Sequence, residues 1–380
     1  MKNKKKNIAF YIGDFKRSGG TERTSIAVAN GLASTEKYSI YLFVTNSKEE
    51  KAFFEIDKKV NIVYLDVKNV KKGFFSLQKR IYNSLKSHSI SSLIAVEVFS
   101  LFFLILPVLF SGKKKINLIT WEHFNFAVDA GHKLRKVARK LAIRFSISIV
   151  VLTEKDKEMW CEANRKIKAC PIYVIGNPSP FEIIKDDYNI NSKKVIAIGR
   201  LTDQKGFDLL IAIWKKFVTQ YPEFRNEGWH LDIIGSGVDY ESLNSFILDN
   251  NLQDTIFLKG STDKIQEYYK HASFLAMTSR YEGLPMTLLE AQSFGLPIIA
   301  YDCLTGPSDI ISDKSGVLVN MFDDERFVGG LKDLVEHKEL RISMSREALK
   351  EIEGYSLNNI LNLWNKVFCK NKFNENKVIK

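Results

Sequence analysis

Two glutamates stand eight positions apart in the stretch EGLPMTLLE, on either side of a tight turn. Glu282 precedes the turn, where Gly283 gives a permissive backbone. Pro285 suits the first position of a helix, and the amides of residues 286–288 would then point out of the helix start, which favours an anion. Glu290 lies about two turns further along that helix. A phosphate-bearing ligand at this helix start could therefore reach both carboxylates.

Two cations follow an expected strand in the segment IGRLTDQKGFDLLI. Arg200 and Lys205 come after the strand and before the next helix. Two cations beside a helix start would neutralise a diphosphate, and the arginine fork matches phosphate geometry. A solvated basic loop would explain either residue alone, but it explains less well the presence of both near a separate anion site.

Other polar residues also follow expected strands. His123 and Glu122 come after the strand KINLIT, where either a functional or a packed histidine would fit. Gly260 and Ser261 follow TIFLK, where backbone groups could bind a nucleobase. Gly20 ends the loop GDFKRSGG ahead of a helix, where the backbone could approach a phosphate or a sugar, although paired glycines are more often only a turn.

Two more loops follow strands of the second half. The G-x-G of Gly235 and Gly237 fits either close packing or the approach of a substrate. The segment TGPSDII, with Gly306 and Asp309, is expected to form a loop and a helix start that offers polar groups to a sugar.

The order of apolar segments indicates how these loops are positioned. Short apolar runs alternate with longer amphipathic stretches such as 20–34 and 73–88, which is typical of parallel sheets covered by helices on both faces. The segment YVIGNPSPF at 173–181 contains a glycine and two prolines and interrupts the alternation. After this segment the alternation restarts. The expected strands are 7–12, 38–45, 60–65, 92–98, 115–120, 146–153, 193–200, 229–235, 255–260, 273–279, 297–302 and 316–319.

This pattern predicts an α/β protein with two doubly wound Rossmann-like domains that face each other across a deep cleft, with ligands at the carboxyl ends of the strands. We expect an N-terminal domain over 1–175 and a C-terminal domain over 176–355. Residues 356–380 are expected to form a helical tail that packs back toward the first domain.

Composition narrows the class of protein. The chain has 380 residues, 45% of them hydrophobic, a formal charge of +12 and a mean hydropathy of −0.14, which describe a soluble globular protein with an anionic partner. The four cysteines form no CxxC pair, so reduced thiols in a cytoplasm are expected. The apolar run after the basic start is too short for a signal peptide. The segment 98–110 is too short for a membrane span and predicts a buried strand–helix pair.

Much of the positive charge lies in the first half. In 131–145 the apolar residues Leu134, Val137, Ala138, Leu141 and Phe145 recur at helical spacing, and lysines and arginines fill the other faces. Further lysines stand at 4–6 and 113–115. The helix could lie on an anionic membrane surface, or it could pack on the core with a solvated basic back. Aromatic residues do not interleave with the basic run, so no nucleic-acid partner is expected.

The strings GRLTDQKGFDLLI, GSG, EGLPMTLLEAQSFGLPIIAYD and GPSDII, in this order and spacing, resemble the retaining GT-B glycosyltransferases of family 4. The second half carries most of the resemblance, and the first half shares the GG loop and the WEH segment. The combination is similar to enzymes that assemble lipopolysaccharide, O-antigen, capsule or exopolysaccharide.

The resemblance implies that the domain over 1–175 is the acceptor side and that the domain over 176–355 binds the nucleotide sugar. It also implies a role for each matching position. Arg200 and Lys205 would bind the donor diphosphate, Glu290 the ribose hydroxyls, and Glu282 the transferred sugar. The backbone of Gly283, Leu284 and Pro285 would contact the sugar and phosphates, Gly20 would face the diphosphate, and His123 would touch the donor sugar. Cys303 and Leu304 depart from the family's usual residues before the TGPS loop.

The activity implied is transfer of a hexose from a nucleotide sugar, UDP-linked, to a lipid-linked or cell-surface glycan with an α-glycosidic bond. No D-x-D motif closes an apolar strand, so neither a metal nor another cofactor is expected. The expected location is the cytoplasm, with the inner face of the plasma membrane as an option.

Two other functions remain open, an isomerase and a non-catalytic subunit, and a third, a dehydrogenase, is disfavoured. An isomerase of the same fold, such as a nucleotide-sugar epimerase, would need no acceptor. A non-catalytic subunit would be expected to lack Glu282, Arg200 or Lys205, all of which are present. A nicotinamide-dependent dehydrogenase would carry G-x-G-x-x-G after the first strand, where this chain has none.

Overall fold

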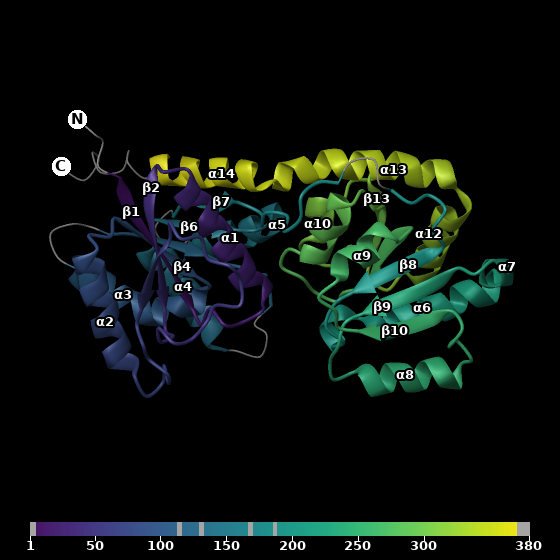
Figure 1. Cartoon of the computed structure of the whole chain (residues 1–380), viewed down its shortest axis with the longest axis horizontal. Helices are drawn as coiled ribbons and strands as arrows, with labels where there is room; N and C mark the ends of the chain where they lie inside the picture. Colours follow the sequence, from purple (N-terminus) through teal and green to yellow (C-terminus); the bar gives the residue numbers. More distant parts are fainter. Residues whose placement is uncertain (1–4, 112–115, 129–132, 166–169, 185–187, 371–380) are drawn as a thin grey trace. The chain divides into compact units, whose positions relative to one another are not determined.

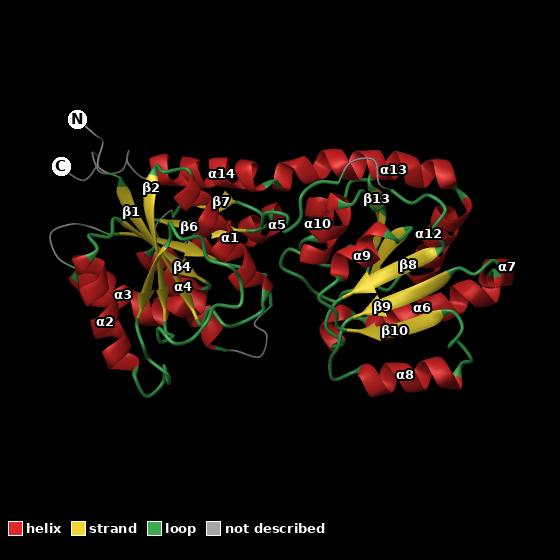
Figure 2. Ribbon diagram, in the orientation of Figure 1, coloured by secondary structure: helices red, strands yellow, loops and turns green. Residues whose placement is uncertain are grey.

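The computed structural model describes residues 5–111, 116–128, 133–165, 170–184 and 188–370. It divides the chain into two compact units, residues 1–178 with 357–380, and residues 179–356. From the sequence, these domain boundaries are predicted after residues 175 and 355. Each unit is a parallel α/β layer structure, as predicted (Figure 1, Figure 2).

The first unit contains a parallel sheet of seven strands in the order β3-β2-β1-β4-β5-β6-β7. The chain runs outward from β1 in one direction and then returns to start β4 on its other side, so β1 and β4 form the switch point of this sheet. The strands are β1 (Lys6–Gly13), β2 (Tyr38–Val44), β3 (Asn61–Tyr64), β4 (Ser92–Val96), β5 (Asn117–Trp121), β6 (Ser148–Val151) and β7 (Ile172–Val174).

Helices cover both faces of this sheet, which is why its central strands are apolar on both sides. One face packs on α2 to α5, and the other on α1 and α14. The helices are α1 (Gly20–Ser34), α2 (Phe74–Ser87), η1 (Val98–Ser100), α3 (Leu101–Phe110), α4 (Leu134–Phe145), α5 (Glu154–Asn164) and α14 (Leu357–Lys370).

The last described helix, α14, is part of the first unit although it follows the second in sequence. Its Trp364 lies against Trp121 with ring centroids 4.8 Å apart, and Tyr38 donates a hydrogen bond of 2.8 Å to Asn365. A methyl group on Gly31 would stand 2.8 Å from Leu361, so α1 and α14 approach closely only because position 31 has no side chain.

The second unit contains a parallel sheet of six strands in the order β10-β9-β8-β11-β12-β13, and its switch point lies between β8 and β11. Its strands are β8 (Lys194–Ile198), β9 (His230–Ile234), β10 (Ile256–Gly260), β11 (Phe274–Met277), β12 (Ile298–Tyr301) and β13 (Gly316–Val319). Its helices are η2 (Asp203–Lys205), α6 (Phe207–Gln220), α7 (Pro222–Asn226), α8 (Tyr240–Asp249), α9 (Ile265–Lys270), α10 (Met286–Ser293), α11 (Pro307–Ile310), α12 (Asp324–Glu336), α13 (Lys338–Glu351) and η3 (Ile352–Tyr355).

Two sequence predictions about elements are wrong. The segment 98–110 is helical throughout, as η1 and α3, and contains no strand. The segment 173–181, which was expected to interrupt the pattern of strands, begins inside a strand. Its first two residues belong to β7, which pairs with β6 at the edge of the sheet. In the described part of the chain, no helix combines the length and the apolar character needed to cross a membrane.

Candidate active site

The predicted cations and carboxylates of the second unit meet at its switch point. β8 and β11 are hydrogen-bonded neighbours, so the loops that follow their carboxyl ends lie side by side. The loop after β8 carries Arg200 and Lys205, and the loop after β11 carries Glu282.

Lys205 and Glu282 form an ion pair with 2.6 Å between Nζ and Oε1. The two side chains are 16% and 8% exposed, so the pair is largely shielded from water. The lysine stem lies along Gly199, where an added methyl group would stand 3.2 Å from three of its carbons. The structure thus brings together one predicted diphosphate ligand and the predicted sugar ligand.

Arg280 joins the two loops, and the sequence analysis missed it. Its guanidinium makes two hydrogen bonds to the Asp208 carboxylate, of 2.9 and 2.6 Å, and donates to the Asp203 carbonyl at 2.7 Å. Its backbone amide donates to the Gln204 carbonyl at 2.8 Å. The Arg280 guanidinium lowers the pKa of Asp208, so the pair stays ionised. A charged residue directly after a buried strand was the available signal.

The turn before α10 is fixed from the loop after β12. Thr305 donates a 2.6 Å hydrogen bond to the Glu282 carbonyl. Gly306 has a φ of +102°, and a methyl group there would stand 2.5 Å from Pro285 and 3.0 Å from the Gly283 carbonyl oxygen. Gly306 is therefore needed for this close approach.

The start of α10 differs in detail from the prediction. Pro285 has an extended ψ of 109° and precedes the first helical residue, Met286, instead of being that residue. The amide of Leu288 is not open to a ligand, because it donates to the Pro285 carbonyl at 3.1 Å. The helix start therefore offers fewer amides than the sequence suggested.

Glu290 lies inside α10 and is 8% exposed. Its Oε2 accepts a 2.7 Å hydrogen bond from the Tyr269 hydroxyl. The Tyr269 ring stacks on Phe294, with centroids 5.3 Å apart and planes 11° apart. A buried carboxylate held in this way keeps a fixed orientation. Tyr269 comes from α9, and no local pattern pointed to it.

The other predicted residues of this unit make no polar contact with the ion pair. The Arg200 side chain is exposed, and it forms no hydrogen bond or ion pair with another described residue. Gly260 is the last residue of β10, the edge strand two places from β8, and Ser261 follows it. Gly235 and Gly237 serve packing, because methyl groups there would stand 1.8 Å from the Gly199 carbonyl oxygen and 2.1 Å from that of Leu201.

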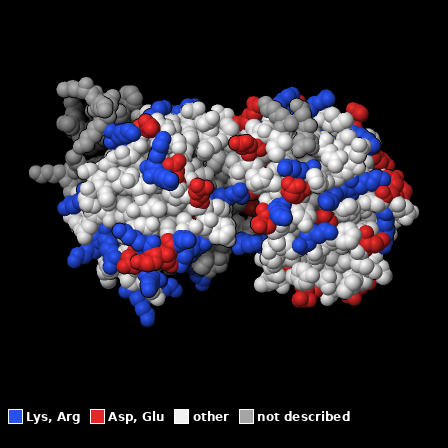
Figure 3. Space-filling model, viewed as in Figure 1, with Lys and Arg blue, Asp and Glu red and all other residues white. Residues whose placement is uncertain are grey.

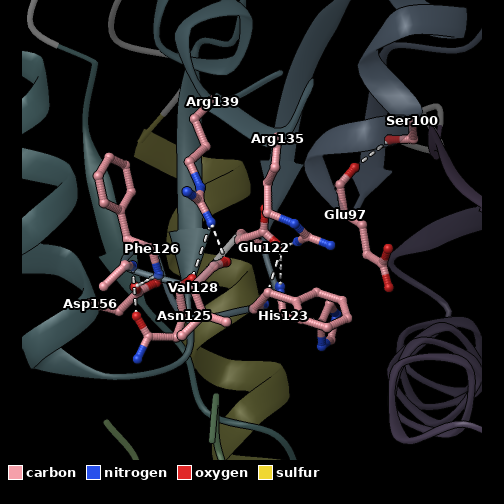
Figure 4. A network of polar contacts seen from close by, with 12 residues as sticks. Glu97, Ser100, Glu122, His123, Asn125, Phe126, Val128, Arg135, Arg139 and Asp156 are labelled. Atoms are coloured by element: carbon pink, nitrogen blue, oxygen red, sulfur yellow. Dashed lines mark hydrogen bonds and ion pairs between the residues drawn. The ribbon is translucent and has the colours of Figure 1, made fainter. Parts of the chain in front are cut away.

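In the first unit, Glu122 and His123 follow β5 and belong to a buried polar network (Figure 4). Oε1 of Glu122 accepts from the amides of His123 and Phe124, at 3.0 Å each. It also lies 3.5 Å from the Arg135 guanidinium, and both side chains are nearly inaccessible. Burial raises the pKa of Glu122, whereas the Arg135 charge lowers it.

His123 is buried, and its Nε2 has no hydrogen-bond partner among the described residues. Burial lowers the pKa of His123 to about 3, so the imidazole is neutral at physiological pH. Its ring lies against Trp121, with centroids 4.5 Å apart.

Helix α4 contradicts one of its two predicted placements, the core-packed helix with a solvated basic back. Leu134, Val137 and Phe145 are 62%, 47% and 36% exposed, while Arg135 and Arg139 are 3% and 4% exposed. The arginines are buried because the polar loop before α4 needs donors. Arg139 donates to the carbonyls of residues 125 and 128, and Arg135 lies over the ring of Phe124. Residues 131 and 132 of the predicted segment, and the lysines at 4 and 113–115, lie outside the described residues.

Gly20 begins α1 and is exposed. Glu22 in the same turn is 8% exposed, and its carboxylate lies 2.5 Å from where a methyl group on Gly19 would stand. The predicted roles of Gly20 and His123 toward a donor stay predictions.

Known proteins are similar to this chain in sequence and in fold. Residues 180–351 match the model of the family described as glycosyl transferases group 1. An uncharacterized glycosyltransferase of Haemophilus influenzae is 31% identical over 366 residues, covering 94% of this chain and 99% of the relative. The amylovoran biosynthesis glycosyltransferase AmsD of Erwinia amylovora is 32% identical over 369 residues, covering 95% and 99%.

The chain belongs to the group 1 glycosyltransferases. Its fold is that of solved GT-B enzymes: the lipopolysaccharide outer core galactosyltransferase WaaB aligns over 96% of this chain and 99% of its own, with a TM-score of 0.74 and 23% identity. The two Rossmann-like units therefore form the GT-B architecture. Relatives of this chain act in bacterial polysaccharide and lipopolysaccharide biosynthesis.

Proposed function

We propose that this glycosyltransferase moves a hexose from a UDP-linked sugar to a lipid-linked or cell-surface glycan, with retention of configuration, and forms an α-glycosidic bond without a metal ion. The observation that carries the proposal is the shielded Lys205–Glu282 pair, 2.6 Å apart at the switch point of the second sheet. It places a cation and a carboxylate where an α/β sheet binds its ligand.

Each group of the second unit then has a chemical task. Cleavage of a sugar–phosphate bond leaves negative charge on the diphosphate, which Lys205 and Arg200 stabilise as it forms. Glu282 accepts hydrogen bonds from hydroxyls of the transferred sugar, and Glu290 from those of the ribose. Gly283, Leu284 and Pro285 contact the donor through their backbone, and Gly260 and Ser261 contact the base. The departing phosphate oxygen accepts the proton of the acceptor hydroxyl.

The named relatives support the choice of donor and acceptor. A solved structure of Anabaena HepE contains UDP-glucose. The lipopolysaccharide 1,6-galactosyltransferase of Salmonella typhimurium is 27% identical over 311 residues. The first name gives a UDP-hexose as a ligand, and the second gives lipopolysaccharide as the glycan. We take these two chemical classes for the donor and the acceptor of this chain.

A surface of the first unit supports a lipid-borne acceptor. The exposed face of α4 carries Leu134, Val137 and Phe145 next to exposed basic side chains, which are Lys133, Lys136, Lys140 and Arg144. The neighbouring helix α3 exposes Leu109 and Phe110, at 58% and 70%. Apolar side chains among lysines suit an anionic lipid surface, which the apolar groups enter and the cations neutralise.

The experiment is thermal unfolding of the purified protein with a panel of UDP- and GDP-sugars. A ligand that binds only the folded state raises the unfolding temperature by mass action. We expect one UDP-sugar to stabilise the wild type and to stabilise Glu290→Ala much less. The matched control is Glu339→Ala, which removes an exposed glutamate of α13 and should respond like the wild type. No stabilisation by any nucleotide sugar would contradict the proposal.

A further inference from the structure

Glu97 stands at the switch point of the first sheet, directly after β4. β4 is hydrogen-bonded to β1 on one side and to β5 on the other. Ligands of open α/β sheets lie outside the carboxyl ends of the strands at such a point. Glu97 therefore occupies in the first unit the position that the Lys205 and Glu282 loops occupy in the second.

The backbone of Glu97 is held in a strained conformation. Its φ is +64° and its ψ is 144°, a region that residues other than glycine rarely adopt. Three hydrogen bonds hold it there: its amide donates to the Trp121 carbonyl at 2.8 Å, and its carbonyl accepts from the amide and the hydroxyl of Ser100, at 3.2 and 2.7 Å. A glycine would avoid this strain, so the fold retains a glutamate here at a cost in stability.

The Glu97 carboxylate is partly buried, and no hydrogen bond or ion pair within 4.0 Å joins it to another described residue. Figure 4 shows it extending away from Ser100 and from the Arg135–Glu122 pair. A carboxylate that is desolvated and still lacks a partner is costly, because its lone pairs have lost water without gaining donors. A ligand with hydroxyl groups would supply those donors.

A second unpartnered group lies on the neighbouring loop. His123 follows β5, is 9% exposed, and its Nε2 has no hydrogen-bond partner among the described residues. The Glu97 amide is bonded to Trp121, two residues before His123, so the two loops are directly joined. Two polar groups without partners on adjacent strand ends indicate a polyhydroxylated ligand.

We propose that Glu97 binds the acceptor sugar, with its carboxylate accepting hydrogen bonds from acceptor hydroxyls. This inference rests on the proposed transfer function and names the part of the first unit that recognises the acceptor. It requires the carboxylate form of Glu97, because a protonated carboxyl accepts hydrogen bonds less well.

The groups around Glu97 set the pH at which this form is present. Burial, followed by the Glu122 charge, raises the pKa of Glu97 to about 7, with Arg135 and Arg17 opposing the rise and Glu22 adding to it. The KM for the acceptor should therefore rise as the pH falls below about 7, while the KM for the donor should not follow the same curve.

The test compares Glu97→Gln and Glu97→Gly with the wild type in three measurements. Stabilisation by UDP and release of UDP from the donor without acceptor report on the donor. Transfer to whichever octyl glycoside the wild type glycosylates, from octyl glucoside, octyl galactoside and octyl N-acetylglucosaminide, reports on the acceptor. We expect both variants to retain UDP stabilisation and to lose roughly 10- to 100-fold in kcat/KM for the octyl glycoside, the loss typical of a hydrogen bond to a charged group.

Stability gives an independent readout that needs no acceptor. The folded state binds a proton at Glu97 more tightly than the unfolded state, so ionising this group between about pH 4.5 and 7 disfavours folding. Both variants should therefore unfold at a higher temperature than the wild type at pH 8, and Glu97→Gly should also gain from release of strain. A residue with a purely structural role would instead lose stability on substitution.

Unchanged transfer, acceptor KM and pH profile in Glu97→Gln would overturn this inference and leave the proposed function standing. A lower unfolding temperature for both variants at pH 8 would overturn it as well. Absence of UDP stabilisation in the wild type itself would contradict the proposed function, and the inference with it.

Discussion

At the scale of single residues, the Lys205–Glu282 ion pair depends on Arg280. The Arg280 side chain makes its hydrogen bonds to other residues near the two loops that carry the pair. Arg280 binds Asp208 and the Asp203 carbonyl, so it holds η2 against the loop after β11. Displacement of either loop would move Lys205 away from Glu282. A positioning role of this kind predicts a functional loss without a direct ligand contact.

Arg280→Ala should therefore weaken stabilisation by the UDP-sugar by about tenfold in apparent Kd, while the protein remains folded. The measurement is the ligand dependence of the unfolding temperature. Arg225→Ala is the matched control, because Arg225 makes an equivalent two-bond pair with Asp254, at 2.9 and 2.7 Å, on the surface of the same unit. Equal ligand responses in both variants would show that Arg280 does not position the site.

Asp156 makes a prediction about pH and stability. It is buried, accepts a 2.7 Å hydrogen bond from the Phe126 amide, and has a pKa raised to about 7 by burial. The folded state then binds more protons than the unfolded state between about pH 4 and 7, so the free energy of unfolding falls as the pH rises through this range.

In Asp156→Asn this pH-dependent contribution to the free energy of unfolding is absent. The side-chain amide oxygen of the variant can still accept the hydrogen bond from the Phe126 amide. We expect the variant to gain stability relative to the wild type as the pH is raised from 4.5 to 8, as measured by urea unfolding. Glu154→Gln, an exposed change on the same helix, should show no such trend. A constant difference between Asp156→Asn and the wild type at all pH values would contradict the assignment.

At the scale of secondary-structure elements, α4 has two different faces. Its inner face supplies Arg135 and Arg139 to the loop that carries Glu122 and His123. Its outer face exposes leucine, valine and phenylalanine among lysines. Figure 3 shows further basic side chains gathered over the part of the first unit where Figure 1 places α2, with acidic side chains beside them.

The double variant Lys136→Glu/Lys140→Glu should bind vesicles of phosphatidylglycerol and phosphatidylcholine at least about 30-fold more weakly. Each of the two cations near an anionic surface contributes about 1 kcal/mol, and about 1.4 kcal/mol corresponds to a factor of ten. Co-sedimentation with the vesicles measures this. Lys264→Glu/Lys314→Glu, exposed lysines of the second unit, should bind as the wild type does. Equal weakening in both double variants would indicate a general charge effect rather than docking through α4.

Much of the fold could be predicted, because strand and helix periodicity in a parallel α/β protein is local. Helix α1 has the predicted bounds, 20–34, and all twelve strands predicted by range overlap an observed one. The further strand expected within 98–110 is absent, because η1 and α3 occupy this segment. That segment is too uniformly apolar for periodicity to separate helix from strand. The sequence left two placements of α4 open and did not predict the burial of Arg135 and Arg139. This burial depends on the folded path of the loop between β5 and α4, which supplies the carbonyls and the carboxylate.

The candidate site was predictable only where its residues belong to a local sequence pattern. Glu282, Lys205 and Glu290 follow strands or lie in the helix after a turn, so the sequence indicates them as candidate site residues. Arg280 and Tyr269 act through tertiary contacts with Asp208 and Glu290, which no spacing in the chain encodes. The strain at Glu97 is likewise visible only in the backbone angles.

At the scale of the whole molecule, each unit presents its polar groups at the switch point of its own sheet. In the second unit these are Lys205 and Glu282, and in the first they are Glu97 and, on the next strand, His123. We propose that the second unit binds the nucleotide of the donor and that the first unit binds the acceptor. The sugar is then transferred from the nucleotide with retention of configuration.

The most direct test follows the anomeric protons by NMR while the protein acts on the UDP-sugar that stabilises it, with an octyl glycoside as acceptor. We expect the anomeric signal of the donor to decline. An α-anomeric signal of the new glycoside should appear at the same rate as UDP is released. Lys205→Ala should abolish both changes. A β-anomeric product would contradict retention, and an altered nucleotide sugar without glycoside would contradict transfer itself.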